Sequence, residues 1–367
     1  MNKANVGIIG CGNISSIYME NINNLFVNVN LYAICDLMEE RTKEAAEKFN
    51  VKHILSYDEM INSKEVQIIL NLTTPKNHYK ICKDALLAGK HVYVEKPLSL
   101  NLEEGKELVA LAKSKNLLLG GAPDTFLGAG IQTCIKAIED GLIGEVISAN
   151  AYMMCHGHES WHPDPEFYYQ SGGGPMFDMG PYYLTALVAM IGPVSEVVGM
   201  NQISFPERII TSKKKFGNAI QVEVPTHVTG LLKFKNGAIG NIITSFDTWG
   251  SMLPRIEVHG TRGSLIVPDP NCFDGEVLLK QYFSSQFEKL PLTSIYSMNS
   301  RGAGISDMAN CILQGRKDNR ANGELACHVL NIMVAIHESQ EKKEFIPLET
   351  TCEKPRLLDS DLLKGRI

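Results

Sequence analysis

Near its start the chain carries glycines and an acidic residue at a spacing that suits dinucleotide binding. A glycine-rich turn separates an apolar stretch from a helix-like one and contains Gly10, Gly12, Asn13 and Ile14. Gly10 permits a tight turn, and Gly12 lets backbone N–H groups approach a pyrophosphate at the positive end of a helix. Asp36 ends the next apolar stretch, where its carboxylate would bind an adenosine ribose and repel a 2′-phosphate. The pattern predicts NAD rather than NADP. A plain strand–helix turn, with Asp36 as a helix cap, is the alternative.

A second group with chemical potential is Glu95-Lys96-Pro97, which follows the apolar stretch 91–94. Pro97 disfavours a helical conformation at Lys96, so we expect the lysine to project from the carboxyl edge of a strand. Ligands bind at that edge in open α/β sheets. An amine beside an oxidised nicotinamide would have a lowered pKa and could take part in acid–base chemistry. The alternative is a surface lysine balanced by Glu95.

A third group consists of residues whose side chains can bind metals. They are Cys155, His156, His158, Glu159 and His162. Such ligands at short spacing could hold Zn²⁺. Neither a C-x-x-C nor an H-E-x-x-H frame accompanies them, so we predict no metal and keep a zinc site as the alternative. We expect these residues to form a loop over a pocket, where Trp161, His162 and Tyr168 would line a site for a sugar or polyol.

The elements around these residues indicate the fold class. Strand-like and helix-like stretches alternate over residues 6–119, which predicts an α/β N-terminal domain with a Rossmann-type doubly wound parallel sheet. Strand-like patterns then dominate, and helical patterns return near the end. These later patterns predict an α+β C-terminal domain with a large, mostly antiparallel sheet. The strand-like segments are 146–154, 196–204, 219–235, 238–247 and 255–267, and the late helical segments are 305–314 and 322–343.

Composition narrows the class of protein further. The chain has 35 Lys and Arg against 41 Asp and Glu, a net charge of −6, which argues against nucleic-acid or anionic-membrane partners. We recognise neither a signal-peptide h-region nor an apolar run of about 18 residues. The nine cysteines are scattered without a C-x-x-C pair, which predicts reduced thiols and a cytoplasmic location.

Five motifs, in this order, resemble those of the glucose–fructose oxidoreductase / inositol dehydrogenase (Gfo/Idh/MocA) family. They are Gly10-x-Gly12, Asp36, Thr73-Thr74-Pro75-x-x-His78, Gly89-Lys90-His91-Val92 and Glu95-Lys96-Pro97. The resemblance covers nearly the whole chain. It implies that Lys96 faces both nicotinamide and a substrate hydroxyl, and that the Lys96–Pro97 bond is commonly cis. It also implies cofactor contacts at Thr73, Thr74, Pro75, His78 and Glu95.

A glycine run at 172–174, followed by a helix-like stretch, resembles the family's second signature. There an Asp is followed four positions later by a His, and this chain has Asp178 and Tyr182. Residues at that spacing share one helix face. Tyr thus stands where the family usually has His, although some members, including glucose–fructose oxidoreductase and dihydrodiol dehydrogenases, are similar in using Tyr. Tyr183 is the alternative by one register, and a buried helix with core tyrosines is the structural alternative.

By this resemblance the catalytic residues are Lys96, Asp178 and Tyr182. Tyr182 would exchange the hydroxyl proton, with its pKa lowered by Lys96 and NAD⁺, while Lys96 would hydrogen-bond the substrate oxygen. Asp178 would fix a neighbouring hydroxyl or orient Lys96. Asp124 could also reach the pocket, and the alternative is that it caps a loop. Arg301 and Asp307 lie at the start of the late helical segment 305–314 and could close the pocket.

Together these features predict an NAD(P)-dependent oxidoreductase. It would transfer a hydride between nicotinamide and a secondary alcohol or ketone of a sugar, cyclitol or related polyhydroxy compound. We expect residues 1–122 to bind the cofactor and residues 123–367 to serve substrate binding and oligomerisation, with the last helices packing back on the first domain. The resemblance implies a homodimer or homotetramer. The alternatives are an NAD-dependent glycoside-cleaving enzyme that uses transient oxidation and elimination, and a catalytically silent ligand sensor.

Overall fold

The N-terminal part of the chain forms a six-stranded sheet. The structure is a computed structural model that describes residues 2–359, 365 and 367. The strand order is β3-β2-β1-β4-β5-β6, and every neighbouring pair is parallel. The strands are β1 (Ala4–Ile9), β2 (Val29–Cys35), β3 (His53–Ile54), β4 (Ile68–Asn71), β5 (His91–Val94) and β6 (Leu119–Gly121). This is the order of a Rossmann sheet, so the predicted N-terminal fold is confirmed.

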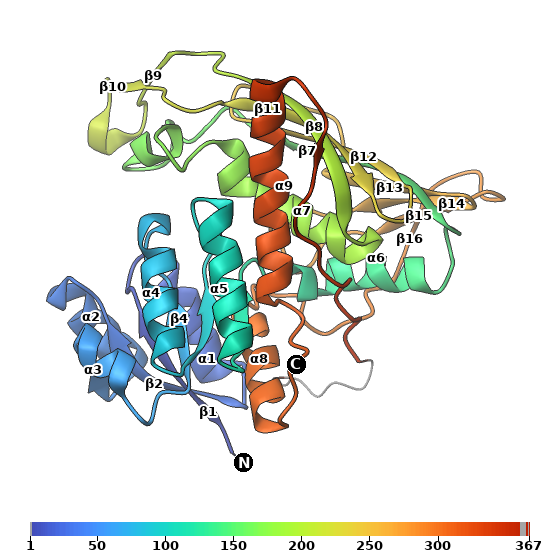
Figure 1. Cartoon of the computed structure of the whole chain (residues 1–367). Coiled ribbons are helices and arrows are strands. Elements are labelled where there is room, and N and C mark those ends of the chain that lie inside the picture. Colours follow the sequence, from blue (N-terminus) through green and yellow to red (C-terminus); the bar gives the residue numbers. More distant parts are fainter. Residues whose placement is uncertain (1, 360–364, 366) are drawn as a thin grey trace.

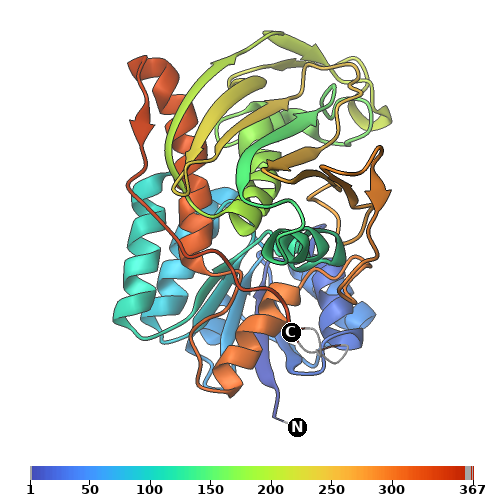
Figure 2. The same ribbon diagram turned by 90° about the vertical axis from the view of Figure 1, so that its right-hand side faces the viewer.

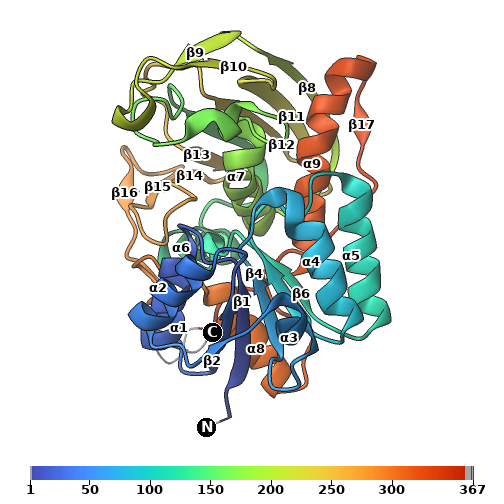
Figure 3. The same ribbon diagram turned by 90° about the vertical axis from the view of Figure 1, so that its left-hand side faces the viewer.

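Helices cover both faces of this sheet, which is why its strands are continuous apolar runs rather than alternating ones. Figure 3 shows α1 and α2 on one side of the strands and α4 and α5 on the other. All four residues of β4 are buried. The helices are α1 (Ser15–Asn24), α2 (Glu39–Phe49), α3 (Tyr57–Asn62), α4 (Pro75–Leu87) and α5 (Leu102–Ser114).

The C-terminal part forms a nine-stranded sheet in the order β16-β15-β14-β13-β7-β12-β11-β8-β17. Strands β7 and β12 run parallel, and all other neighbours are antiparallel, as predicted for a mostly antiparallel sheet. The strands are β7 (Val146–Met154), β8 (Val194–Gln202), β11 (His227–Phe234), β12 (Ile239–Ser245), β13 (Ile256–Gly260), β14 (Gly263–Val267), β15 (Leu278–Gln281), β16 (Glu288–Lys289) and β17 (Ile346–Pro347).

One face of the nine-stranded sheet packs against α6 (Ala129–Glu139), α7 (Pro175–Ile191) and α9 (Gly323–Lys342), and in the described part of the chain the other face is open to solvent. The burial pattern alternates accordingly, most clearly along β11. The open face carries large apolar side chains at Met200 and Ile239, which are 76% and 62% exposed.

Two predicted strands are divided in the structure. The segment 219–235 separates into β10 (Ala219–Gln221), which pairs with β9 (Glu207–Ile209), and β11. Pro225 lies between the two parts, and a proline cannot donate to a central strand ladder. The segment 255–267 is a hairpin of β13 and β14, because the chain turns back at Thr261-Arg262.

The last helices connect the two sheets. Helix α8 (Ala303–Leu313) contacts β1, β2 and β6, while α9 contacts β6 and α5 as well as β8 and α7. Figure 1 shows α9 running from the Rossmann sheet to the nine-stranded sheet, and Figure 2 shows the chain after β17 descending beside it. In the described part of the chain, no helix is long and apolar enough to cross a membrane.

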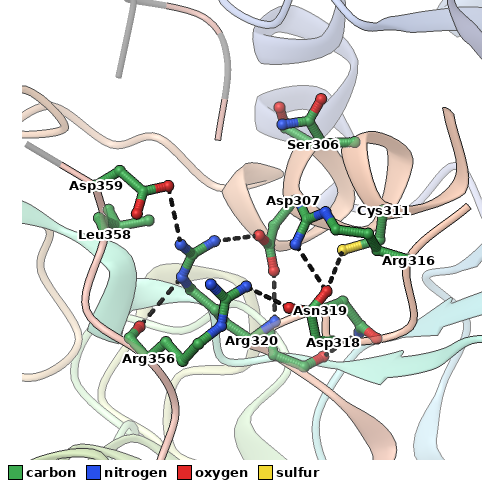
Figure 4. Close-up of polar contacts among 12 residues, drawn as sticks. Ser306, Asp307, Cys311, Arg316, Asp318, Asn319, Arg320, Arg356, Leu358 and Asp359 are labelled. Carbon is green, nitrogen blue, oxygen red and sulfur yellow. Dashed lines mark hydrogen bonds and ion pairs between the residues drawn. The ribbon is translucent and has the colours of Figure 1, made fainter. Parts of the chain in front are cut away.

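A buried ion pair anchors the C-terminal segment. Asp307 on α8 is 1% exposed, and its Oδ1 lies 2.6 Å from the Arg320 guanidinium, whose side chain is only 3% exposed. Figure 4 shows that the same guanidinium donates to the backbone carbonyl of Arg356 at 3.1 Å. It also donates to the Leu357 carbonyl at 3.3 Å. Asp307 therefore stabilises the fold and lies outside the pocket, contrary to its suggested role in closing it.

We expect Arg320→Met to lower the free energy of unfolding by about 3–5 kcal/mol, because it leaves the Asp307 carboxylate buried without its counter-charge. Urea denaturation of both proteins measures the difference. Arg316→Met is the matched control, since Arg316 pairs with the half-exposed Asp318 near the surface and its loss should cost at most about 1 kcal/mol. Equal losses in the two variants would contradict this account of the Arg320 pair.

Candidate active site

A cleft of about 1190 Å³ lies at the carboxyl ends of the Rossmann strands and is walled by residues from both parts of the chain. That edge is where open α/β sheets bind ligands. The structure brings together in its lining Gly10, Gly12, Asn13, Ile14, Asp36, Thr73, Thr74, Pro75, Glu95, Lys96, His162, Tyr168, Asp178 and Tyr182. The other predicted site residues are not among the lining residues, namely His78, Asp124, Trp161 and Tyr183.

The glycine turn is shaped for close approach of a ligand. Gly10 has φ +103°, and a Cβ there would lie 2.8 Å from the backbone of Leu72, so a larger residue would strain or move the turn. At Gly12 a Cβ would meet nothing within 4 Å, which leaves open space directly before α1. Free backbone at a helix N-terminus fits the diphosphate of a dinucleotide.

Asp36 lies at the end of β2 beside this turn. Its Oδ2 accepts a hydrogen bond from the Cys11 N–H at 2.7 Å, and its Oδ1 accepts one from the Met38 N–H at 2.8 Å. The carboxylate therefore both fixes the glycine turn and supports the start of α2, while it still lines the cleft. Asp36 is not the N-cap of α2, which is Met38 and has no side-chain cap, and its role as ribose acceptor stays a prediction.

His78 supports the cleft from behind and does not line it. It is fully buried, and its ring nitrogens lie 2.6 Å from the Pro97 carbonyl and 3.0 Å from the Thr73 carbonyl. Burial lowers the pKa of His78, although both carbonyls act to raise it. His78 thus links two loops that line the cleft, and its expected contact with the cofactor stays a prediction. The peptide bonds Lys96–Pro97 and Ala122–Pro123 are both cis.

Lys96 and Asp178 meet across the cleft. The Lys96 Nζ donates to Asp178 Oδ1 at 2.8 Å and to the Asp178 backbone carbonyl at 2.5 Å, and each side chain is 18% exposed. Burial lowers the pKa of Lys96, but Asp178 and Tyr182 raise it, and the net pKa lies above the ordinary lysine value. Lys96 therefore carries its proton here, and the lowered pKa expected beside an oxidised nicotinamide stays a prediction.

Tyr182 faces Lys96, and Tyr183 does not. The Lys96 Nζ lies 5.4 Å from the centre of the Tyr182 ring, so the ammonium sits over the aromatic face. Burial raises the pKa of Tyr182, the positive charges of Lys96 and Arg301 lower it, and the net direction is upward. Tyr183 is 1% exposed and interacts with Arg255 instead. Because α7 places the two phenols on different sides, only Tyr182 reaches the cleft.

The loop after β7 contributes aromatic rings to the cleft. His162 and Tyr168 line the cleft, whereas Trp161 is 62% exposed and lies outside it. His156 stacks on Trp249 with ring centres 3.4 Å apart. Among the residues that the structure describes, no group of three or more His, Cys, Asp and Glu side chains could hold a metal ion.

Asp124 and Arg301 lie behind the catalytic side of the cleft. Asp124 is 1% exposed and accepts hydrogen bonds from the Gly302 and Gly304 N–H groups at 2.8 and 3.0 Å, so it caps the start of α8 and is not among the residues that line the cleft. Burial raises its pKa to about 6. The Arg301 guanidinium interacts with the Tyr182 phenol. Sequence reasoning gave Arg301 little weight, because its place before a helix is the only local signal.

A Rossmann sheet with a glycine turn, an acidic β2 end and a lysine–carboxylate pair in the same cleft defines a dinucleotide-dependent oxidoreductase. Residues 4–121 match the oxidoreductase family with an NAD-binding Rossmann fold, and residues 131–266 match the GFO/IDH/MocA C-terminal domain. The chain belongs to the Gfo/Idh/MocA family of oxidoreductases, and NAD is its cofactor class.

Similar proteins include two that are named as sugar or cyclitol dehydrogenases. Myo-inositol 2-dehydrogenase of Thermotoga maritima is 28% identical over 261 residues, which are 71% of this chain and 74% of that protein. Levoglucosan dehydrogenase of Pseudarthrobacter phenanthrenivorans is 26% identical over 252 residues, which are 64% of this chain and 63% of that protein.

Solved structures share the fold. Levoglucosan dehydrogenase in complex with NADH superposes with a TM-score of 0.81 at 22% identity, covering 95% of this chain and 100% of that one. An NAD binding oxidoreductase from Klebsiella pneumoniae gives a TM-score of 0.82 at 21% identity, covering 94% and 99%. At these identities the likeness establishes the fold alone.

Proposed function

We propose that this protein oxidises, or in reverse reduces, a secondary alcohol of a sugar, cyclitol or related polyhydroxy compound with NAD. The observation that carries the proposal is the contact between Lys96 and Asp178, with the Tyr182 ring beneath the ammonium, in the cleft that the glycine turn also lines. The activities of the inositol, levoglucosan and xylose dehydrogenases to which the chain is similar agree with this substrate class.

In the proposed mechanism, Lys96 donates a hydrogen bond to the substrate oxygen and stabilises the negative charge that develops there. Tyr182, as phenolate, accepts the hydroxyl proton while the C–H bond breaks and the carbonyl forms. Asp178 holds the ammonium in place through Oδ1. When bound, NAD supplies the nicotinamide ring that accepts or returns the hydride. Residues of the glycine turn, with Asp36, Thr73, Thr74, Pro75 and Glu95, would hold that cofactor.

A substrate panel tests this function. Purified protein is incubated with NAD⁺ and myo-inositol, levoglucosan or D-xylose, and formation of NADH is followed at its absorbance band. We expect net NADH with at least one of these compounds. Cleavage of an aryl glycoside without net NADH would favour the glycoside-cleaving alternative, and NAD binding without any turnover would favour a ligand sensor.

We expect NAD to bind more tightly than NADP, and Asp36→Ser to reduce that preference by roughly 10-fold or more. The substitution removes the carboxylate that repels a 2′-phosphate, and Arg41 lines the same cleft and can pair with the phosphate. Titration of each cofactor by fluorescence measures both dissociation constants. Glu39→Ser is the matched control, because Glu39 is 86% exposed and pairs with Lys43 outside the cleft. Tighter NADP binding by the wild-type protein would contradict the role of Asp36.

We also propose that residues 1–122 are the cofactor domain and residues 123–367 the substrate and oligomerisation domain. A homodimer or homotetramer would form through the open face of the nine-stranded sheet, where Met200, Leu231 and Ile239 are exposed. Sedimentation of the purified protein tests the oligomeric state.

The state of the cysteines bears on the location of the protein. All nine cysteines are free, and seven of them are buried, which supports a reducing cytoplasm as the location.

A further inference from the structure

Asp178 has a second neighbour besides Lys96. The His158 Nε2 lies 3.7 Å from Asp178 Oδ2, while Asp178 Oδ1 bonds the Lys96 ammonium. The three side chains therefore form one line, with the carboxylate in the middle. A separation of 3.7 Å is longer than a formed hydrogen bond, but active-site contacts of this kind commonly shorten when substrate binds.

The ring of His158 is held in a fixed orientation. It stacks on Tyr168 with centres 3.7 Å apart and planes 8° apart, and the edge of Phe246 packs against it at 4.6 Å. The backbone is anchored as well, because the His158 N–H donates to the Tyr169 hydroxyl at 3.3 Å and the His158 carbonyl accepts from the His162 N–H at 2.9 Å.

The next residue ties this turn to two other segments of the chain. Glu159 Oε1 pairs with the Arg208 guanidinium on β9 at 2.7 Å, and both side chains are at least nine-tenths buried. Arg208 also pairs with Asp247, which follows β12. The loop that carries His158 is thus held to β9 and to the segment after β12, so the direction of the imidazole toward Asp178 is set by the fold.

The chemistry of histidine, rather than its shape, distinguishes this position. The side chain is 10% exposed, and its Nδ1 is buried without a hydrogen-bond partner among the described residues. A buried nitrogen without a hydrogen-bond partner lowers stability, and a phenylalanine would fill the same stack without one. The benefit of the imidazole must therefore lie on its other side, where Nε2 faces the carboxylate.

We propose that His158 is a positioning residue of the active site, which donates from Nε2 to Asp178 Oδ2 and thereby keeps Oδ1 directed at the Lys96 ammonium. This inference rests on the proposed function of Lys96 and Asp178. Burial lowers the pKa of His158 to about 4, so the ring is neutral near pH 7 and has a single N–H to donate. The titratable groups that face the ring are Asp178, Glu159, His162 and Lys96.

Two variants separate a hydrogen-bonding role from a packing role. His158→Phe keeps the stack on Tyr168 and removes the donor, whereas His158→Gln removes the ring and keeps an N–H. We expect His158→Phe to lose about 10-fold in kcat, the loss typical of a hydrogen bond to a charged group, with an unchanged Kd for NAD. His158→Gln should recover most of that activity. His156→Gln is the matched control on the same loop, because His156 stacks on Trp249 outside the cleft.

Rescue by glutamine is the readout that a packing role would not give, because His158→Gln loses the stacked ring and keeps only the donor. We expect His158→Phe to lower kcat with little change in KM, and His158→Gln to restore kcat. Rates are measured with whichever of myo-inositol, levoglucosan and D-xylose the wild-type protein oxidises fastest. Wild-type kcat in His158→Phe, or equal losses in both variants, would overturn the inference. Lys96→Met, assayed in parallel, tests the proposed function separately: it should be inactive whichever result His158 gives.

Discussion

Replacing Lys96 by methionine is expected to lower kcat by at least ~10²-fold while NAD still binds. Methionine retains much of the lysine volume, but it removes the ammonium that bonds Asp178 Oδ1 at 2.8 Å and lies over the Tyr182 ring. The developing charge on the substrate oxygen then has no donor from this side of the cleft. Steady-state oxidation of the preferred polyol and fluorescence titration of NAD measure the two quantities.

Lys83→Met is the matched control for this loss. Lys83 lies on α4, pairs with Glu107 near the surface and does not line the cleft. Its replacement should leave both turnover and NAD affinity close to wild type, because exposed ion pairs contribute little. A near-wild-type rate in Lys96→Met would remove the mechanism, and a loss of NAD binding in that variant would assign Lys96 to cofactor binding instead.

Replacing Tyr182 by phenylalanine is expected to lower kcat by ~10²-fold or more, the usual contribution of a positioned acid–base group. The variant keeps the aromatic ring beneath the Lys96 ammonium and removes only the hydroxyl. Because the net pKa of Tyr182 lies above its ordinary value, the phenolate fraction and the oxidation rate should rise with pH in the wild-type protein. That rise should be absent in Tyr182→Phe.

Tyr183→Phe provides the comparison for this second result. Tyr183 follows Tyr182 on α7, but it interacts with Arg255 away from the cleft. Its variant should keep the wild-type rate and pH dependence. If instead Tyr183→Phe is inactive and Tyr182→Phe is active, the register assigned to the second signature is off by one residue and the proton route must be redrawn.

Much of the fold followed from local sequence patterns. Continuous apolar runs ended by Gly10 and Asp36 predicted buried parallel strands, and the structure places both residues at strand ends in one cleft. These predictions succeed because each depends on a few neighbouring residues. The division of segment 219–235 was missed, since the effect of Pro225 on one strand becomes clear only when its pairing partners are known.

The candidate site was less accessible to sequence reasoning. Lys96 and Asp178 are 82 positions apart, and their contact was anticipated only through a family resemblance. His78 was expected to contact the cofactor, and Asp124 either to reach the pocket or to cap a loop. Backbone groups from distant loops bind both side chains in buried positions. The neighbourhood of His158 arises from the rings of Tyr168 and Phe246 and the ion pair with Arg208, which come from separate segments of the chain and which no local spacing encodes.

The most direct measurement of the central claim is transfer of deuterium. The preferred polyol, deuterated at its reacting carbon, is mixed with the protein and NAD⁺, and the nicotinamide product is analysed by mass spectrometry. The account predicts that the wild-type protein forms NADH carrying the label at the nicotinamide ring, and that Lys96→Met forms almost none. Unlabelled NADH, or equal labelling by the two proteins, would contradict hydride transfer at a site built around Lys96.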